Sequence, residues 1–421
     1  MILVYDGMNS SSENLRQSGA SLLKKLKEIH GTFRIYGSSP ADLLVLPDDR
    51  LLYLLSILKN DSSIIAPVLD DKGWEDFIDF LNRQSITPLI YQSLRQMPLN
   101  SKPPIEILEK MKNVYFGGVY RSVKMEQVLK KVLDAANNNH IPILVLKGQA
   151  TARTIYADPA LRVSSDIDFI VSPKDLVTMR NILETIGCTS SEQTIREFDR
   201  QCGGYNEEVF YINNYPGIPI EIHWKLFPYY QLNRYIDLET MFQRAITVEQ
   251  EYIAFKTLDY IDSLIYTSMH MMYGHNKEIE LKWIIDISLL AKKLSSSDDW
   301  KELQRRCVQQ RVVLAVEKSL LMAQLWTDFR IPAEFENFSK WPAPSKEDEK
   351  NLSLALNDKT WDQFRLMFPN DASFMEKVRI LYHSAFPEPV LLLGTDSPYK
   401  RIYLPILYIK RWWKLFMGLF L

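Results

Sequence analysis

Residues 162–171 have the sequence Arg-Val-Ser-Ser-Asp-Ile-Asp-Phe-Ile-Val, and this stretch decides the fold that we predict for the chain. Ile167 to Val171 is a short apolar run that indicates a buried strand. Side chains alternate between the two faces of a strand, so Asp166 and Asp168 project from one face while the apolar side chains enter a core on the other. Two carboxylates held together repel each other unless a cation lies between them, and oxygen ligands suit a hard ion such as Mg²⁺. We therefore predict a metal-binding strand with one buried face.

A helix is expected directly after this strand. Ser172 and Pro173 are typical of an N-cap and a first helical position. Apolar residues then recur at helical spacing from Leu176 to Ile186, and Gly187 stands where a C-cap glycine belongs. The sequence thus predicts a strand and helix in direct succession.

A second strand and a glycine turn precede the acidic strand. Ile141 to Leu146 is apolar and is closed by Lys147 and Gly148, after which Gln149 to Tyr156 indicates a helix. The N-terminus of a helix presents free N–H groups and the positive end of its dipole to an anion. We expect a triphosphate to lie there, in contact with Lys147, Gly148 and Gln149, with Arg162 near enough to offset its charge.

A hairpin supplies a third carboxylate. Glu208 to Ile212 and Ile218 to Trp224 have strand character, and they flank a loop of turn-forming residues, 213–217. In the second of these strands, Glu221 and His223 lie on the face opposite to the apolar residues. If this strand pairs beside the acidic strand, three carboxylates converge and can hold two metal ions about 3.5 to 4 Å apart.

The order of these elements resembles the DNA polymerase β-like nucleotidyltransferase superfamily. The pattern is most similar to an uncharacterised bacterial family within it. That pattern comprises Leu146-Lys147-Gly148, Arg162 ahead of Asp166-Ile167-Asp168, Glu221-Ile222-His223 and a helical segment from Leu264 to Leu290. The resemblance covers about residues 74–295.

The resemblance implies a transfer reaction in which a nucleophile attacks the α-phosphate of a nucleoside triphosphate such as ATP. Asp166 and Asp168 would bind two Mg²⁺ ions, or Mn²⁺ in their place, and Glu221 would bind the ion on the nucleophile side and help remove its proton. The acceptor would be a hydroxyl or similar group of a small molecule, a sugar derivative or a protein. Two positions depart from the superfamily pattern: Gly148 is followed by Gln149 rather than Ser or Gly, and the third acid is Glu rather than Asp.

Several of these residues have a structural alternative. Lys147 is equally suited to a solvated strand end, and Arg162 to an ion pair with Asp158 or Asp166. His223 fits a hydrogen-bonding partner of the metal ligands as well as a residue that contacts the nucleotide.

The later helix offers three further candidates. Lys282, Trp283 and Asp286 would line the acceptor or base pocket, or else Trp283 packs in the core and Lys282 pairs with Asp286 within the helix.

Composition limits the class of protein. The chain has 421 residues with 46% hydrophobic and 24% charged residues, which is typical of a globular protein with two or three domains. A net charge of -2 gives no general attraction for long nucleic acid, so we do not expect a polymerase. Three cysteines, Cys188, Cys202 and Cys307, are too widely spaced for a CxxC metal site and indicate buried thiols. The N-terminus has no secretion signal, which makes the cytoplasm the expected location.

The predicted architecture is α/β, with a small mixed sheet and flanking helices between two helical regions. We expect an N-terminal extension at residues 1–65, a helical region at 66–137, the nucleotidyltransferase core at 138–245 and a helical domain at 246–400. The active cleft should lie between the sheet and the later helices.

Residues 401–421 form a basic and aromatic tail. Tryptophans and other apolar residues mix there with Lys410, Arg411 and Lys414, and Pro405 interrupts the segment, which argues against a membrane-spanning helix. The tail either packs on the body of the protein or lies at a membrane surface or partner groove.

A further alternative for the whole chain is a binding or scaffold protein that keeps the sheet but does not catalyse a reaction, which the Gly148-Gln149 departure suggests.

Overall fold

A computed structural model describes residues 34–35, 48–190, 206–215, 217–250, 252–274, 278–356 and 401–420, together with residues 374, 375, 378, 382 and 386. Within these residues the chain forms a seven-stranded mixed sheet with helices on both faces. The predicted α/β class is confirmed. Most of the N-terminal extension, Cys202 and parts of the segment between 357 and 400 lie outside the described residues.

The acidic strand lies in the middle of the sheet. The strand order is β4-β5-β6-β3-β2-β8-β7, with parallel pairing of β3 with β6 and of β2 with β8, and antiparallel pairing elsewhere. The strands are β2 (Ile143–Val145), β3 (Ile167–Val171), β4 (Cys188–Ser190), β5 (Glu207–Ile212), β6 (Pro219–His223), β7 (Ile246–Gln250) and β8 (Ile253–Thr257). A separate parallel pair joins β1 (Arg34–Ile35) to β9 (Glu278–Ile279).

The sheet continues past residue 245, where we expected the helical region to begin. In β8, Ile253, Phe255 and Thr257 are buried while the two residues between them are exposed, which is the period of a strand with one covered face. The helical period that we expected from residue 246 therefore begins only at α11 (Tyr260–Tyr273). The strands β4, β7 and β8 are additions to the four strands that the sequence predicts.

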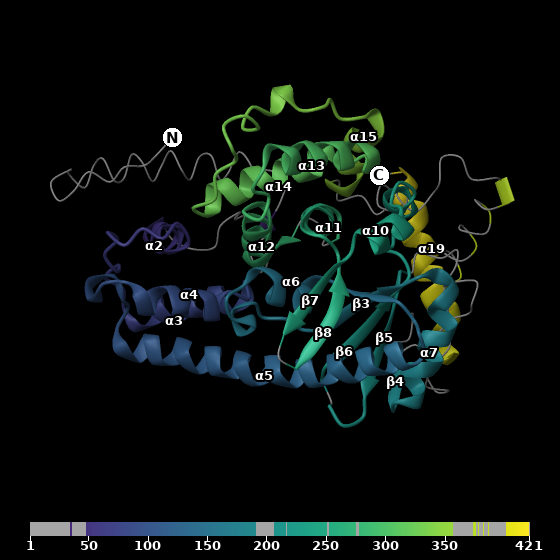
Figure 1. Ribbon diagram of the computed structural model, residues 1–421, viewed down its shortest axis with the longest axis horizontal. Coiled ribbons are helices and arrows are strands. Elements are labelled where there is room, and N and C mark those ends of the chain that lie inside the picture. Colours follow the sequence, from purple (N-terminus) through teal and green to yellow (C-terminus); the bar gives the residue numbers. More distant parts are fainter. Residues whose placement is uncertain are drawn as a thin grey trace.

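Each face of the sheet has its own hydrophobic core. On one face, Ile167, Phe169 and Val171 pack in a cluster with residues of α5 (Ile105–Asn138) and α7 (Leu176–Thr185). On the other face, Ile170 belongs to a larger cluster that includes residues of α11 and α12 (Leu281–Ala291). In Figure 1 the long helix α5 runs along the bottom of the molecule, while helices α11 to α15 lie at the top.

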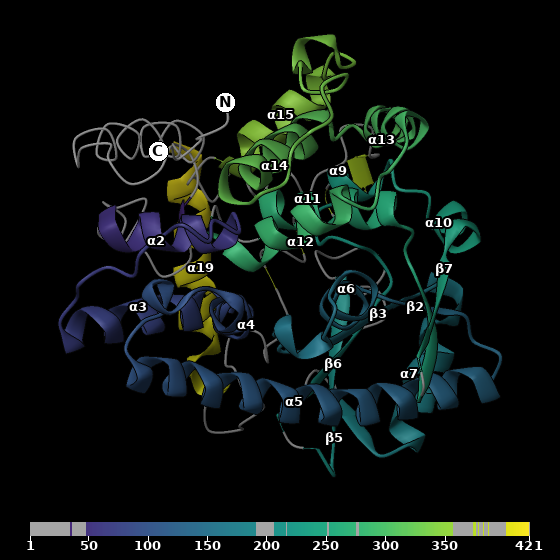
Figure 2. The ribbon, with the colours of Figure 1, turned by 60° about the vertical axis from the view of Figure 1, so that its left-hand side comes forward.

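Helices from both ends of the described chain contribute to the larger core. Leu54 of α2 and Phe77 of α3 share this cluster with Val316 of α14. Figure 2 shows α2, α3 and α4 beside the sheet region, with α5 passing beneath both. The remaining helices are α2 (Asp48–Leu58), α3 (Asp71–Arg83), α4 (Thr87–Gln96), α6 (Lys147–Ile155), α9 (Tyr230–Asn233), α10 (Leu238–Arg244), α13 (Ser297–Gln310), α14 (Val313–Trp326) and α15 (Lys346–Leu356). Short 3₁₀ helices occupy Leu99–Ser101, Pro159–Leu161, Pro173–Asp175, Phe338–Lys340 and Arg401–Tyr403.

Two local predictions near α7 have different outcomes. Gly187 follows the helix with φ of +86°, a conformation that suits glycine, so its predicted role is confirmed. Ser172 makes no side-chain cap, because a 3₁₀ turn at Pro173–Asp175 intervenes before α7. Cys188 and Cys307 are buried free thiols, as predicted.

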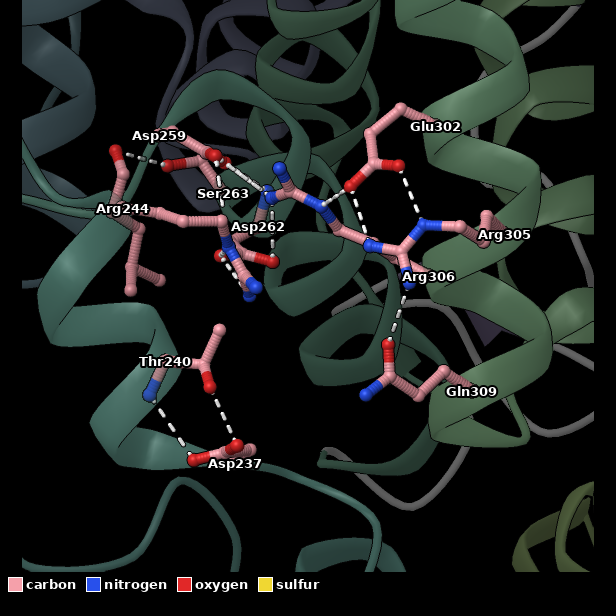
Figure 3. Close-up of polar contacts among 11 residues, drawn as sticks. Asp237, Thr240, Arg244, Asp259, Asp262, Ser263, Glu302, Arg305, Arg306 and Gln309 are labelled. Carbon is pink, nitrogen blue, oxygen red and sulfur yellow. Dashed lines mark hydrogen bonds and ion pairs between the residues drawn. The ribbon is translucent and has the colours of Figure 1, made fainter.

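A charged cluster fixes the start of α11 to its neighbours (Figure 3). Arg306 of α13 pairs with Asp259 at 2.7 Å and with Asp262 at 3.0 Å, and it also reaches Glu302 at 2.8 Å. Arg244 of α10 pairs with Asp262 at 2.8 Å from the other side. Because Asp259 caps α11 and β8 ends just before it, the cluster anchors the helical half where it joins the sheet.

The tail forms helix α19 (Leu404–Phe420). Ile406, Ile409 and Trp413 are exposed, and Trp412 packs edge-on against Phe386 with ring centres 4.9 Å apart. None of the helices in the described part of the chain combines the length and apolar character needed to cross a membrane.

Candidate active site

Asp168 and Glu221 are brought together by the pairing of β3 with β6. The two strands are parallel, and Asp168 stands directly opposite Glu221 in the register. Opposite residues project from the same face of a sheet, so both carboxylates point toward the helices of the larger core. Among the described residues, Asp168, Glu221 and His223 each offer a ligand atom within 4.8 Å of the other two.

Asp168 is almost completely buried at 1% exposure. Its Oδ1 accepts hydrogen bonds from Nζ of Lys147 at 3.0 Å and pairs with Nε2 of His223 at 3.0 Å. Its Oδ2 has no hydrogen-bond partner among the described residues. Burial by itself would raise the pKa of Asp168, but the Lys147 ammonium and the His223 ring outweigh it and hold that pKa well below its usual value.

His223 lies between three carboxylates and is fully buried. Its Nε2 is 3.7 Å from Oε2 of Glu221, and its Nδ1 is 3.2 Å from Oε2 of Glu207. Burial opposes the charged ring, yet the hydrogen bonds to Asp168 and Glu221 raise the pKa of His223 to about 9. Burial raises the pKa of Glu221 to about 7. His223 therefore contacts the carboxylates and does not line the cavity, which favours the alternative that it is their hydrogen-bonding partner.

Asp166 lies at the cavity, one residue before β3 begins. Its Oδ2 accepts a hydrogen bond from Oγ of Ser165 at 2.8 Å. Burial and the nearby charge of Asp168 raise its pKa. Asp166 shares the cavity with Glu221, but it stands outside the tight group of Asp168, Glu221 and His223.

The turn before α6 places a cation and a helix N-terminus at the same cavity. α6 begins at Lys147, two residues earlier than the sequence indicates. Lys147 has φ of +42°, a left-handed conformation that costs a non-glycine residue about 1–3 kcal/mol. Its ammonium pairs with Asp168, so Lys147 is not a solvated strand end.

Gly148 is required for steric reasons. A Cβ atom at this position would lie 1.7 Å from Oγ of Ser164 and 2.9 Å from its Cβ. The first turn of α6 therefore packs directly against residues 162–165, the segment that leads into the acidic strand. This packing sets the distance between the helix N-terminus and the carboxylates.

Gln149 does not line the cavity. Its side chain donates to Sδ of Met125 on α5 at 3.4 Å and accepts from Arg153 at 2.6 Å. Its buried amide thus connects α6 to α5, and the structure does not bring it to the expected triphosphate position.

Arg162 lines the cavity but is paired with Asp286 of α12, through Nη2 to Oδ2 at 2.8 Å and Nε to Oδ2 at 3.1 Å. The hydroxyl of Tyr156 also donates to Asp286, at 2.8 Å. The partner is neither Asp158 nor Asp166, which we considered from the sequence. It comes from α12, so this buried group connects the segment before β3 to the helical half.

The expected pair within α12 is not formed. Lys282 binds Glu280 at 2.7 Å, because Asp286 is engaged by Arg162. Trp283 is buried at 5% exposure and meets the ring of His270 edge-on at 5.1 Å, while its edge still borders the cavity.

These residues enclose a cavity of about 330 Å³, at the lower end of the range for small-molecule sites. It lies between the sheet and the later helices, where the sequence predicts the cleft. The sheet side contributes Lys147, Asp166, Glu207 and Glu221, and the helical side contributes Tyr266, His270, Trp283 and Asp286.

Sequence reasoning missed Glu207 and Tyr266. Glu207 immediately precedes the strand that we predicted from Glu208, and only the register of β5 against β6, which places it opposite His223, reveals its position. Tyr266 belongs to the apolar period of α11 and therefore looks like an ordinary core residue.

The chain was compared with known proteins, and a family model gives the informative match. The solution structure of the antibiotic-resistance factor ANT(2'')-Ia is similar to this chain with 12% sequence identity and a TM-score of 0.30, covering 43% of this chain and 90% of that one. A search of curated proteins finds no match. A family model described as uncharacterised nucleotidyltransferase matches residues 70–328, more than half of the chain. This range includes every residue of the site described above, and the chain therefore belongs to that nucleotidyltransferase family.

Proposed function

We propose that this protein transfers a nucleoside monophosphate from a nucleoside triphosphate to a nucleophilic group of an acceptor, with Asp166, Asp168 and Glu221 as its central carboxylates. The observation that carries the proposal is the position of Asp168 directly opposite Glu221 on adjacent parallel strands, beside a cavity that Glu221 and Asp166 line. Membership of a nucleotidyltransferase family supports the same reaction class.

The residues present fit a divalent cation. The buried Oδ2 of Asp168 has no partner among the described residues, and carboxylate oxygens are the ligands that Mg²⁺ and Mn²⁺ prefer. Asp168 and Glu221 would hold one ion, and Asp166 would complete the site for a second. Such ions, when bound, neutralise phosphate charge and make a hydroxyl nucleophile easier to deprotonate.

The other groups have roles that follow from their positions. Lys147 and the N-terminus of α6 would receive the triphosphate, since both present positive charge to the cavity. Glu221 would accept the proton of the acceptor hydroxyl. As the acceptor oxygen bonds to the α-phosphorus, the bond from that phosphorus to the pyrophosphate oxygen breaks and pyrophosphate leaves.

The acceptor is a small molecule, a sugar derivative or a protein side chain. A cavity of about 330 Å³ between the sheet and two helices suits one nucleotide and one compact acceptor group. With a net charge of -2 the chain does not attract long nucleic acid in general.

For the tail, the exposed side chains of Ile406, Ile409 and Trp413 support a contact with a protein or a membrane surface in the cytoplasm.

Transfer can be tested with nucleoside triphosphates labelled at the α-phosphate, incubated with Mg²⁺, the purified protein and a metabolite and protein extract. We expect label in a product and release of pyrophosphate. Asp168→Asn should reduce the rate on the order of 10³-fold, because it removes a ligand charge at the reacting centre. Asp134→Asn is the matched control, since that carboxylate is exposed on α5 and pairs with Lys130 one turn away.

A non-catalytic binding protein is the second candidate, and the ion pairs of Asp168 favour it. Lys147 and His223 already balance that carboxylate, so the site is electrostatically stable without an ion. Calorimetry separates the two functions. Nucleotide affinity that is the same with and without Mg²⁺, together with no transfer of label from any triphosphate, would support the binding protein and contradict the enzyme.

A further inference from the structure

Helix α11 presents two tyrosines with buried hydroxyl groups. Tyr266 and Tyr273 are 2% and 4% exposed, and neither hydroxyl has a hydrogen-bond partner among the described residues. A buried hydroxyl without a partner is destabilising, whereas phenylalanine would fill the same space without that cost. The two residues differ in one respect: Tyr266 lines the cavity, and Tyr273 does not.

The ring of Tyr266 is held in place by its neighbours. It packs against Phe227 with ring centres 5.6 Å apart at an angle of 61°, and against His270 at 6.3 Å. Phe227 and His270 both line the same cavity. Packing therefore fixes the Tyr266 ring at the wall of the cavity, an arrangement that suits recognition of a ligand.

Tyr266 lies beside the cation of the site. Nζ of Lys147 is 6.0 Å from the centre of its ring and pairs with Asp168 at 3.0 Å. The ammonium of Lys147 lies near the hydroxyl of Tyr266. No group among the described residues forms a hydrogen bond of good geometry with that hydroxyl. Burial raises the pKa of Tyr266, which keeps its proton in place near neutral pH. A hydroxyl donor next to an ammonium group forms a receptor for an anion with several oxygen acceptors.

We infer that Tyr266 is a nucleotide-binding residue of this site and donates a hydrogen bond to the polyphosphate of the triphosphate, next to Lys147. The inference rests on the proposed nucleotidyl transfer and adds to it a binding residue on the helical side of the cavity. It explains why a tyrosine occupies a position in α11 where packing alone would favour phenylalanine.

The test compares Tyr266→Phe with Tyr273→Phe on the full chain. Titration calorimetry with non-hydrolysable analogues of ATP, GTP, CTP and UTP, each with Mg²⁺, gives the dissociation constants. We expect Tyr266→Phe to weaken binding about tenfold or more, as for the loss of a hydrogen bond to a charged acceptor. Tyr273→Phe should bind like the wild type, because Tyr273 is not among the residues that line the cavity. Adenosine and the other nucleosides, which lack phosphate, should bind both variants equally.

Each outcome separates the inference from the proposed function. If the wild type binds none of the four analogues, both fail. If the wild type binds one of them and Tyr266→Phe binds it with the same affinity, the inference alone is overturned. Equal weakening by both variants would show a general effect on the helix and would also overturn it. Thermal unfolding of the variants checks the fold, and the loss of a buried hydroxyl should leave the melting temperature equal or higher.

Discussion

At the scale of single residues, Gly148 shows how closely the phosphate-side helix meets the acidic strand. A Cβ at this position would overlap Oγ of Ser164, so Gly148→Ala should lower the free energy of unfolding by about 1–3 kcal/mol through overpacking. Urea denaturation measures the change. Adding Ser164→Gly should recover most of the loss, because it removes both atoms that the new methyl group would meet.

Gly117→Ala is the control for this prediction. Gly117 lies within α5, and a Cβ there would meet nothing within 4 Å. The change should therefore stabilise the helix by about 0.5–1 kcal/mol. If the losses of stability in Gly148→Ala and Ser164→Gly simply add in the double variant, with no recovery, the contact with Ser164 is not the reason that position 148 requires glycine.

Glu207 is the residue whose role depends most on the register of the sheet. It contacts Nδ1 of His223, whose Nε2 contacts Asp168, so it orients the ring that holds a central carboxylate. Partners of this kind affect metal affinity by about 10–100-fold, and we expect Glu207→Gln to weaken Mn²⁺ binding within that range, as measured by electron paramagnetic resonance. Glu249→Gln, an exposed carboxylate on β7, should have no effect. Equal Mn²⁺ affinity in the Glu207 variant and the wild type would show that Glu207 does not position His223 for metal binding.

At the scale of elements, the sequence predicts those strands whose pattern is local. β3 has the predicted bounds exactly, because a five-residue apolar run with flanking acids is visible without knowledge of its neighbours. Glu221 is placed correctly on its face by alternation alone. β8 was missed because Ala254 and Lys256 alternate with apolar residues just before a long helix, and the helical period dominates that window.

Pairing between elements could not be predicted in the same way. Arg162 has acidic neighbours in sequence, yet its partner is Asp286, 124 residues away on α12. Glu207 likewise reaches the site only through the register of β5 against β6. Which groups meet across elements depends on tertiary packing, and residue spacing carries no information about it.

The cluster at the start of α11 gives a prediction about how elements hold together. Arg306→Met would leave Asp262, which is fully buried, with Arg244 as its remaining cation. Because this buried acid loses one of its two cationic partners, Arg306→Met should lower the free energy of unfolding by about 1–3 kcal/mol, as measured by urea denaturation. Arg305→Met is the matched control on the same helix, because Arg305 is exposed and its partners Glu302 and Gln309 lie on α13 itself. Arg305→Met should change the free energy of unfolding by no more than about 0.5 kcal/mol. Similar losses of stability for both variants would show that the cluster does not anchor α13.

At the scale of the whole molecule, the cavity exists only where two halves of the chain meet. Asp166, Glu207 and Glu221 lie in the sheet or next to it, while Tyr266, His270 and Trp283 belong to helices of the later part of the chain. The sheet and the helical half share the larger core, so the walls of the cavity are fixed by packing that continues through both. An activity that needs both walls should therefore depend on the contacts that join them.

The pair of Arg162 and Asp286 is a buried polar contact between these walls and permits a direct test. Asp286→Leu would leave Arg162 buried without its partner, and we expect a loss of about 3–5 kcal/mol in the free energy of unfolding. Arg162→Met combined with Asp286→Leu removes both charges and should recover much of that stability, because apolar pairs often replace buried ion pairs well. If the pair also sets the position of the segment before β3, nucleotide affinity in the double variant should remain weaker than in the wild type despite its recovered stability. Wild-type affinity in a stable double variant would show that the pair serves the fold alone and that the position of the acidic strand is fixed by the sheet.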